Sequence, residues 1–288
     1  MTNAGPLRYL GDAVPYTYLG DSHAGAIGSI VLDDTADGSR VVTRTFGIWR
    51  LVAADILGPD GLIGEELVQA LRFGGALHSS TTFAPTPGLR PIQTTYGNEK
   101  RTEQLALTET ANERPYVLCV GEIDTRYILH RFVTEGVDFH LPFSTEGLER
   151  LPDFEARQTL RADRMLTYLG EHFKPLFVGL RILHAIGFRT LFLHSLPPPT
   201  IDDGDSERVL KHPSPARLRY KLAMFVNYLY EAVCRDVGIG FINMWPSVTD
   251  GNLLNPQYYL DGLHLNRDHA ILSVCEARRQ LAAHRCAV

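Results

Sequence analysis

Five short runs of apolar, β-branched and aromatic residues recur along the chain, each bounded by turn residues. Such runs are typical of buried strands. Longer segments with apolar residues at helical spacing separate several of them, and this alternation favours a mostly parallel sheet covered by helices on both faces. We therefore predict an α/β fold. The predicted strands are Tyr16 to Leu19, Val41 to Phe46, Tyr116 to Val120, Thr190 to His194 and Gly240 to Met244.

Two apolar stripes predict long core helices. Between Phe154 and Gly187, apolar residues recur at roughly helical spacing. A break is expected near Pro175, because a proline removes one hydrogen bond of a helix. Between Ala216 and Val237, the apolar residues fall on one helix face. A last helix is expected at Asp268 to Ala283.

Two other segments show neither pattern for most of their length. Gly58 to Pro91 holds a short predicted helix, Glu65 to Leu71, and then many Gly, Ser, Thr and Pro residues. Ser195 to Pro215 begins with a run of prolines and continues through acidic residues. Long loops of this kind often carry function in compact domains. We expect residues 1–288 to form one domain, with loop insertions near 58–91 and 195–215.

Composition and charge narrow the possible partners. The 28 Lys and Arg against 33 Asp and Glu give a formal charge of -5, so no basic excess draws the protein to nucleic acid or to anionic membranes. No segment has the length and hydrophobicity of a membrane span, and the first residues do not form a signal peptide pattern. We therefore expect a cytoplasmic protein with neither nucleic acid nor membrane as partner.

No residue pattern in the sequence predicts a cofactor site. The four cysteines stand far apart without Cys-x-x-Cys spacing, so a structural zinc site is not expected. The glycines between Gly20 and Gly28 have neither dinucleotide nor P-loop spacing. Oxygen and nitrogen ligands for a two-metal phosphoesterase are present, but none of their spacings matches a ligand signature, and no metal is expected. These potential ligands are Asp21, His23, Asp124, His194, Asp261 and His264.

A serine and an acid–base pair follow the first and the last predicted strands. Ser22 stands in the turn after the first strand, and Asp261 and His264 stand three residues apart after the last. A serine hydroxyl becomes a good nucleophile when a base accepts its proton and a third group orients that base. By itself, each motif also reads as an ordinary turn or helix cap. Because both positions can fall on one sheet edge, we predict a catalytic triad of Ser22, His264 and Asp261.

The sequences GDSHA, Gly20 to Ala24, and DGLHLN, Asp261 to Asn266, resemble the first and last blocks of the SGNH (GDSL-type) hydrolases, a superfamily of serine esterases and lipases. The sequence GEID, Gly121 to Asp124, matches their third block in part and resembles a variant found among members with a GDSH block. By order and spacing, the resemblance extends from about Tyr16 to Leu281. It implies a three-layer α/β/α sandwich of flavodoxin-like type with a mostly parallel five-stranded sheet.

The resemblance has two departures, both in the groups that would bind an oxyanion. Ile123 stands where the family commonly has an asparagine, and loss of one such donor costs roughly 10²- to 10³-fold in rate. Either Arg126 replaces the missing donor, or the site uses backbone donors alone, or catalysis is weak. The second block, which should supply a glycine N–H, is not evident; Gly47 is the first candidate, and Gly74 or Gly75 the next.

Two further residues near these motifs have open roles. His23, beside the predicted nucleophile, either contacts substrate, tunes the site by its charge, or simply begins the helix after the turn. Asp124 either contacts substrate, forming an acid–base pair with Glu122, or bonds to local backbone and to Arg126.

Together these features predict an enzyme that hydrolyses a small acyl ester through an acyl-enzyme on Ser22. The resemblance implies acetyl-type groups on a carbohydrate or another alcohol, so a small-molecule or glycan ester is the expected partner. Two alternatives remain: an acyltransferase that uses the same triad, and a sugar-binding or assembly module without catalysis, which Ile123 would favour.

Overall fold

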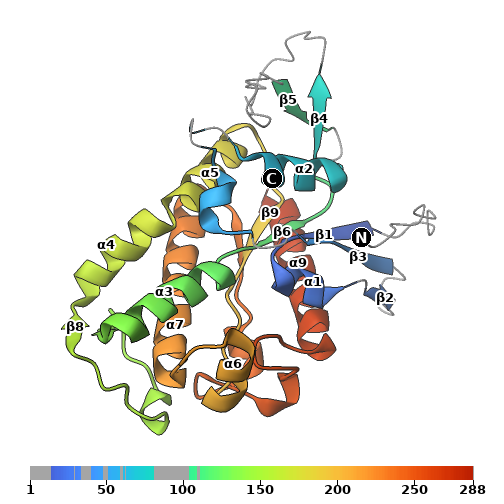
Figure 1. Cartoon of the computed structure of the whole chain (residues 1–288). Coiled ribbons are helices and arrows are strands. Elements are labelled where there is room, and N and C mark those ends of the chain that lie inside the picture. Colours follow the sequence, from blue (N-terminus) through green and yellow to red (C-terminus); the bar gives the residue numbers. More distant parts are fainter. Residues whose placement is uncertain are drawn as a thin grey trace.

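The computed structural model describes residues 14–28, 30–33, 40–47, 51–58, 61, 63–80, 104–108 and 111–287. Its centre is a six-stranded sheet with the order β10-β9-β6-β1-β3-β2 (Figure 1). Five strands are parallel and confirm the five sequence-predicted strands: β1 (Val14–Gly20), β3 (Arg40–Gly47), β6 (Tyr116–Cys119), β9 (Leu191–His194) and β10 (Gly240–Ile242). The sixth, β2 (Val31–Asp33), pairs antiparallel with β3 and was not predicted.

The parallel strands follow the order second, first, third, fourth, fifth along the sheet. The chain thus reverses its direction of winding between β1 and β6. At such a switch point, the segments that leave the two strands diverge to opposite faces, and the crevice between them is where α/β folds bind ligands. The residues directly after β1 and β6 are therefore placed for function by the topology.

Helices cover both faces of the sheet, as predicted. Side chains alternate along the strands: Tyr18 and Val117 face a core with α1 and α9, whereas Leu19 and Leu118 face a larger core on the other side. In Figure 1, α1 and α9 lie next to each other below β1. The helices in the two layers are α1 (Ser22–Ile27) and α9 (Arg267–Ala287), then α2 (Glu65–Phe73), α3 (Glu122–Glu135), α4 (Ala162–His172), α5 (Lys174–Ala185) and α7 (Ala216–Val237).

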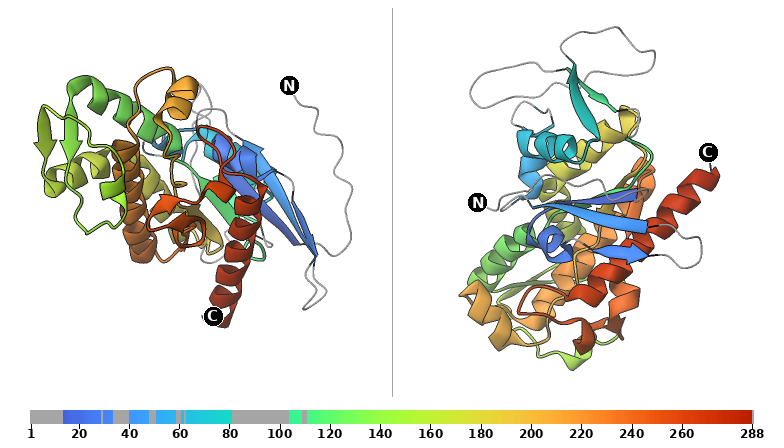
Figure 2. Two further views of the ribbon diagram at one scale, coloured as in Figure 1. Left: turned by 90° about the horizontal axis from the view of Figure 1, so that it is seen from below. Right: turned by 90° about the vertical axis from the view of Figure 1, so that its right-hand side faces the viewer.

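The predicted helices occur with small changes of length. The break near Pro175 is confirmed, since α4 ends at His172 and α5 begins at Lys174. The prediction from Phe154 started the helix too early, because residues 158–160 form β8 (Gln158–Leu160) and pair with β7 (Val137–Phe139). Helix α9 runs along the outside of the molecule in both views of Figure 2.

The segment 195–215 is not only loop. It contains α6 (Asp203–Leu210), which begins where the Asp202 carboxylate accepts the N–H of Asp205 at 3.0 Å. In the segment 58–91, the predicted short helix is α2, and residues 81–91 lie outside the described residues. None of the described helices is both long enough and apolar enough to span a membrane.

Several short elements complete the described chain. Strands β4 and β5 form a separate antiparallel pair beyond α2, at the top of Figure 1. The short elements are η1 (Ala53–Ile56), β4 (Leu77–Ser80), β5 (Gln104–Leu107), η2 (Leu148–Arg150), α8 (Trp245–Val248), β11 (Thr249–Asp250), β12 (Leu253–Leu254) and η3 (Pro256–Tyr258).

Candidate active site

The turn after β1 exposes Ser22 at the switch point. Gly20 has a φ of +151°, and a Cβ there would lie 1.8 Å from the carbonyl oxygen of Cys119 on the neighbouring strand, so only glycine fits. Asp21 caps α1, because its Oδ1 accepts the N–H of His23 at 2.9 Å. Ser22 is the first residue of α1 and is partly buried. The local sequence thus fixes the serine at the carboxyl edge of the sheet.

Asp261 and His264 form the predicted pair. The Nδ1 atom of His264 lies 3.1 and 3.0 Å from the two carboxylate oxygens of Asp261. The same carboxylate accepts the backbone N–H groups of Leu263 at 2.7 Å and of His264 at 2.8 Å. Burial acts to raise the pKa of Asp261, but these hydrogen bonds outweigh it and lower the pKa below its ordinary value. A carboxylate at Nδ1 holds the tautomer that leaves Nε2 free to accept a proton.

Ser22 and His264 share one cavity of about 480 Å³, which we call the Leu260 cavity. Gly47, the last residue of β3, lies directly opposite Gly20 in the strand register and lines the same cavity. The structure therefore brings together three residues that the sequence predicted for the site. Among the described residues, no hydrogen bond joins Ser22 to His264. The Leu260 cavity is lined by Asp21, Ser22, Gly25, Ala26, Gly47, Leu260 and His264.

A second open cavity of about 460 Å³, here the α3 cavity, meets Ser22 from the other side. One face of α3 forms much of its wall, because Ile123, Arg126, Tyr127 and His130 are spaced as neighbours on a helix surface. The opposite wall contains His212, whose ring centroid lies 4.5 Å from that of His130. The sequence analysis did not identify Tyr127, His130 or His212 as candidate site residues. Tyr127 and His130 lie at helical spacing from Ile123, so they could have been found once Ile123 was placed beside Ser22.

Arg126 lines the α3 cavity but is already paired. Its Nε donates to Glu122 Oε1 at 2.5 Å, and its Nη2 forms an ion pair with the other oxygen of Glu122. The Arg126 side chain is 25 % exposed. Arg126 therefore lines one cavity with Ser22, while Glu122 compensates its charge.

The prediction that Asp124 contacts the substrate is wrong. It is buried, and its two oxygens are used inside the protein: Oδ2 accepts the N–H of Ala53 at 3.0 Å, and Oδ1 lies 2.8 Å from Nε2 of His172. On α3, the step from Ile123 to Asp124 turns the side chain from the cavity towards η1 and the end of α4. Asp124 therefore joins elements of the scaffold.

The prediction that Gly74 or Gly75 donates an N–H to the oxyanion is wrong. Gly74 ends α2, where its N–H donates to the carbonyl of Ala70 at 2.9 Å, and the N–H of Gly75 donates to Arg72 at 2.8 Å. Gly74 also packs against Tyr116, the first residue of β6, which places it away from the carboxyl edge of the sheet. Of the three candidate glycines, Gly47 alone lines a cavity with Ser22.

The potential metal ligands do not gather as one set. Within the described residues, Asp21, His23 and Glu122 bring ligand atoms within 4.8 Å of one another. Glu122 is already paired with the Arg126 guanidinium, whose charge opposes a bound cation. His194, for its part, bonds to Ser273 and to a backbone carbonyl. The arrangement is that of a buried ion-pair network.

Comparison with known proteins gives distant likenesses. No family model and no curated protein matches the chain. The chain is similar to a proposed platelet activating factor from Streptococcus pneumonia, at 12 % identity and a TM-score of 0.45, with 95 % of this chain and 86 % of that chain covered. It is also similar to a GDSL-like lipase from Bacteroides thetaiotaomicron, at 11 % identity, a TM-score of 0.40, and 94 % and 88 % coverage.

A third similar structure is a carbohydrate acetylesterase from Sinorhizobium meliloti, at 11 % identity and a TM-score of 0.39, with 94 % of this chain and 99 % of that chain covered. Because all of these TM-scores lie below 0.5, the functional assignment depends on the geometry around Ser22 instead.

Proposed function

We propose that the protein hydrolyses a carboxylic ester through an acyl-enzyme on Ser22. One observation carries the proposal: Ser22 and His264 line the same cavity, while Asp261 occupies the other side of the His264 ring. A nucleophile, a base and a group that orients the base are the parts that acyl transfer needs.

The reaction follows from these positions. Nε2 of His264 takes the proton of the Ser22 hydroxyl as its oxygen attacks the ester carbonyl carbon, and a tetrahedral oxyanion forms. When this intermediate collapses, the bond to the alcohol oxygen breaks, and His264 gives its proton to the departing alcohol. Water then attacks the acyl-enzyme with His264 again as base, which releases the carboxylic acid and restores Ser22. Asp261 stays ionised and stabilises the imidazolium in both halves.

The oxyanion has backbone donors available despite Ile123. Ser22 is the first residue of α1, and the N–H of such a residue has no acceptor within its own helix. Gly47 lines the same cavity and presents no side chain to obstruct a ligand. We assign the oxyanion to the N–H groups of Ser22 and Gly47, with Arg126 contributing only a partly compensated charge.

The two cavities fit the two halves of an ester. The Leu260 cavity is lined in part by apolar residues, including Ala26 and Leu260, and suits the acyl group. The α3 cavity offers aromatic and imidazole rings from Tyr127 and His130, together with open space, and suits a ring-shaped or hydroxyl-bearing alcohol such as a carbohydrate. With the acetyl-type group that the family resemblance implies, this division makes an acetyl-type ester of such an alcohol the preferred substrate.

A fluorophosphonate probe tests the nucleophile. We expect the probe to label Ser22, to be excluded by the Ser22→Ala variant, and to abolish turnover of a simple acetyl ester. Ser195, a buried serine at the end of β9, supplies a matched control, since Ser195→Ala should retain labelling. A folded protein that the probe does not label, with full activity in Ser22→Ala, would refute the proposal and favour a binding module.

Acyl transfer is the second candidate, because the α3 cavity is open and large enough to admit an acceptor alcohol beside Ser22. Transfer and hydrolysis share every step up to the acyl-enzyme. Turnover of an acetyl ester with and without a sugar acceptor separates them: a transferase shows little hydrolysis alone and strong stimulation by the acceptor, whereas a hydrolase is barely affected.

A further inference from the structure

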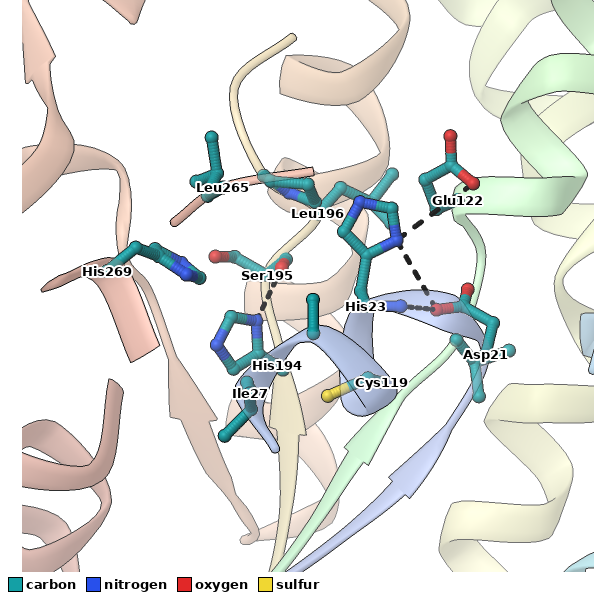
Figure 3. A pocket seen from close by; sticks show the side chains of 13 residues that line it. Asp21, His23, Ile27, Cys119, Glu122, His194, Ser195, Leu196, Leu265 and His269 are labelled. Carbon is teal, nitrogen blue, oxygen red and sulfur yellow. Dashed lines mark hydrogen bonds and ion pairs between the residues drawn. The ribbon is translucent and has the colours of Figure 1, made fainter. Parts of the chain in front are cut away.

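His23 lies between the nucleophile turn and the loop that carries the base. Its ring lines a narrow cavity between α1, the end of β9 and α9, shown in Figure 3, which we call the histidine chamber. The Nε2 atom of His23 lies 3.1 Å from the carbonyl oxygen of Leu263, the residue before His264. The rings of His23 and His264 have centroids 5.1 Å apart. One side chain thus connects two segments 240 residues apart in the chain.

Both ring nitrogens of His23 face acceptors. Opposite Nε2, the Nδ1 atom lies 3.4 Å from Asp21 Oδ1 and 4.0 Å from Glu122 Oε2, as the dashed lines of Figure 3 indicate. A carbonyl and a carboxylate can only accept hydrogen bonds, and a neutral imidazole has one N–H to offer. The surroundings of His23 therefore match the imidazolium form, which carries a proton on each nitrogen.

The charges around His23 agree with that form. Asp21 from the α1 cap and Glu122 from α3 are negative, while Arg126 from α3 opposes them, and the His23 side chain is only 13 % exposed. Burial acts to lower the pKa of His23, but the two carboxylates outweigh it and raise the pKa above its ordinary value. The remaining titratable groups nearby are Cys119 at the end of β6, whose pKa burial raises, His194 at the end of β9, His269 on α9, and the pair of Asp261 and His264.

We propose that His23 is a positioning residue that carries a proton on both nitrogens at neutral pH and holds the Leu263–His264 backbone against the nucleophile turn. This inference rests on the proposed function of Ser22 and His264. The contact from His23 Nε2 to the Leu263 carbonyl fixes the residue directly before the base, so its loss would free the loop that carries His264.

The pH dependence of activity tests the charge. The kcat/KM of the unaltered protein should decline at alkaline pH, where His23 loses one of its two protons and with it one of the contacts that hold the loop. His23→Gln keeps a polar side chain without such a proton, so this alkaline limb should be absent from its profile. His140→Gln, which changes an exposed histidine outside both cavities, is the matched control and should keep the limb.

A ¹⁵N spectrum of the histidine rings tests the protonation state without any turnover. In the Ser22→Ala protein, we expect His23 to show two protonated nitrogens at pH 7, assigned by through-bond correlation to its backbone. A neutral His23 ring overturns the proposal, and so does an alkaline limb that is unchanged in His23→Gln, whatever the plateau rate of that variant. Because the spectrum needs no substrate, it decides the charge of His23 even if Ser22 proves not to be a nucleophile.

Discussion

Two groups of histidines surround the nucleophile turn and respond to their environments in opposite ways. His23 lies at the mouth, where Asp21 and Glu122 outweigh burial and raise its pKa. His194 and His269 line the deeper part of the histidine chamber (Figure 3), where burial lowers their pKa values to about 4 and about 3. The contrast shows that carboxylates within reach, rather than burial alone, decide whether a buried histidine here is charged.

The deeper histidines belong to the scaffold. His194 bonds to the carbonyl of Ser195 at 2.7 Å and to Ser273 Oγ at 2.9 Å, and Ser273 in turn lies 3.1 Å from the Tyr18 hydroxyl. These contacts join β9, α9 and β1 beneath the active site. His194 therefore helps to hold these three elements together, whereas His23 and His264 have the roles proposed above.

The largest difference between the two groups should appear in catalysis. We expect His264→Gln to lower kcat/KM for an acetyl ester by about 10³-fold or more, because no other group takes the proton of Ser22. His269→Gln, its counterpart in the scaffold, should stay within about threefold of the unaltered protein. Steady-state kinetics on both folded variants tests this pair, and equal losses in the two would remove the distinction between mouth and scaffold.

A smaller loss is expected for Asp261→Asn. The amide still accepts the backbone N–H groups of Leu263 and His264, but it cannot favour the imidazolium, and it permits the wrong tautomer. We expect kcat to fall by roughly 10²- to 10⁴-fold with the fold intact. A variant with kcat within a few fold of the original would show that Asp261 does not orient the base.

The scaffold histidines should govern acid stability. The unfolded chain takes up protons below the ordinary histidine pKa of 6.5, whereas native His194 and His269 resist protonation down to about pH 4 and about pH 3. Stability is therefore lost as the pH falls through this window, by about 1.4 kcal/mol per pH unit for each histidine.

Urea unfolding at a series of pH values measures this slope. His269→Gln should show a shallower decline than the unaltered protein between pH 6 and about pH 4. Identical slopes would mean that His269 is not held neutral in the native state. His23→Gln should not flatten the slope in this way, because the pKa of His23 is shifted in the opposite direction.

The smallest effect is expected for Arg126→Gln. Because Glu122 already compensates the guanidinium, we expect kcat to fall by less than about tenfold, well below the cost of losing a full oxyanion donor. A loss of about 10²-fold in kcat at unchanged KM would instead identify Arg126 as the replacement for the asparagine absent at Ile123.

The sequence was sufficient for most of the sheet, for the contact between Asp261 and His264, and for the placement of Ser22 and His264 in one cavity. The five parallel strands are apolar runs between turn residues, a local signal that burial reinforces. Ser22, Asp261 and His264 were accessible because each lies in a short motif. Strand β2 was missed since its three residues carry too short a pattern.

What could not be predicted depends on contacts between distant segments. Asp124 and Ile123 are neighbours in sequence, and only the packing of η1 and His172 shows that one faces the core and the other the cavity. Gly47 and Gly74 look alike in sequence, whereas the strand register places only Gly47 beside the nucleophile turn. The bond from His23 to Leu263 spans 240 residues, so no local pattern could reveal it.

The most direct test of the central claim is a crystal structure of the protein after reaction with a fluorophosphonate. We predict a covalent bond at Ser22 Oγ, with Nε2 of His264 within about 3 Å of that oxygen and a phosphonyl oxygen between the N–H groups of Ser22 and Gly47. An adduct at another residue would contradict the account, and so would a His264 ring that faces away from Ser22 in the adduct.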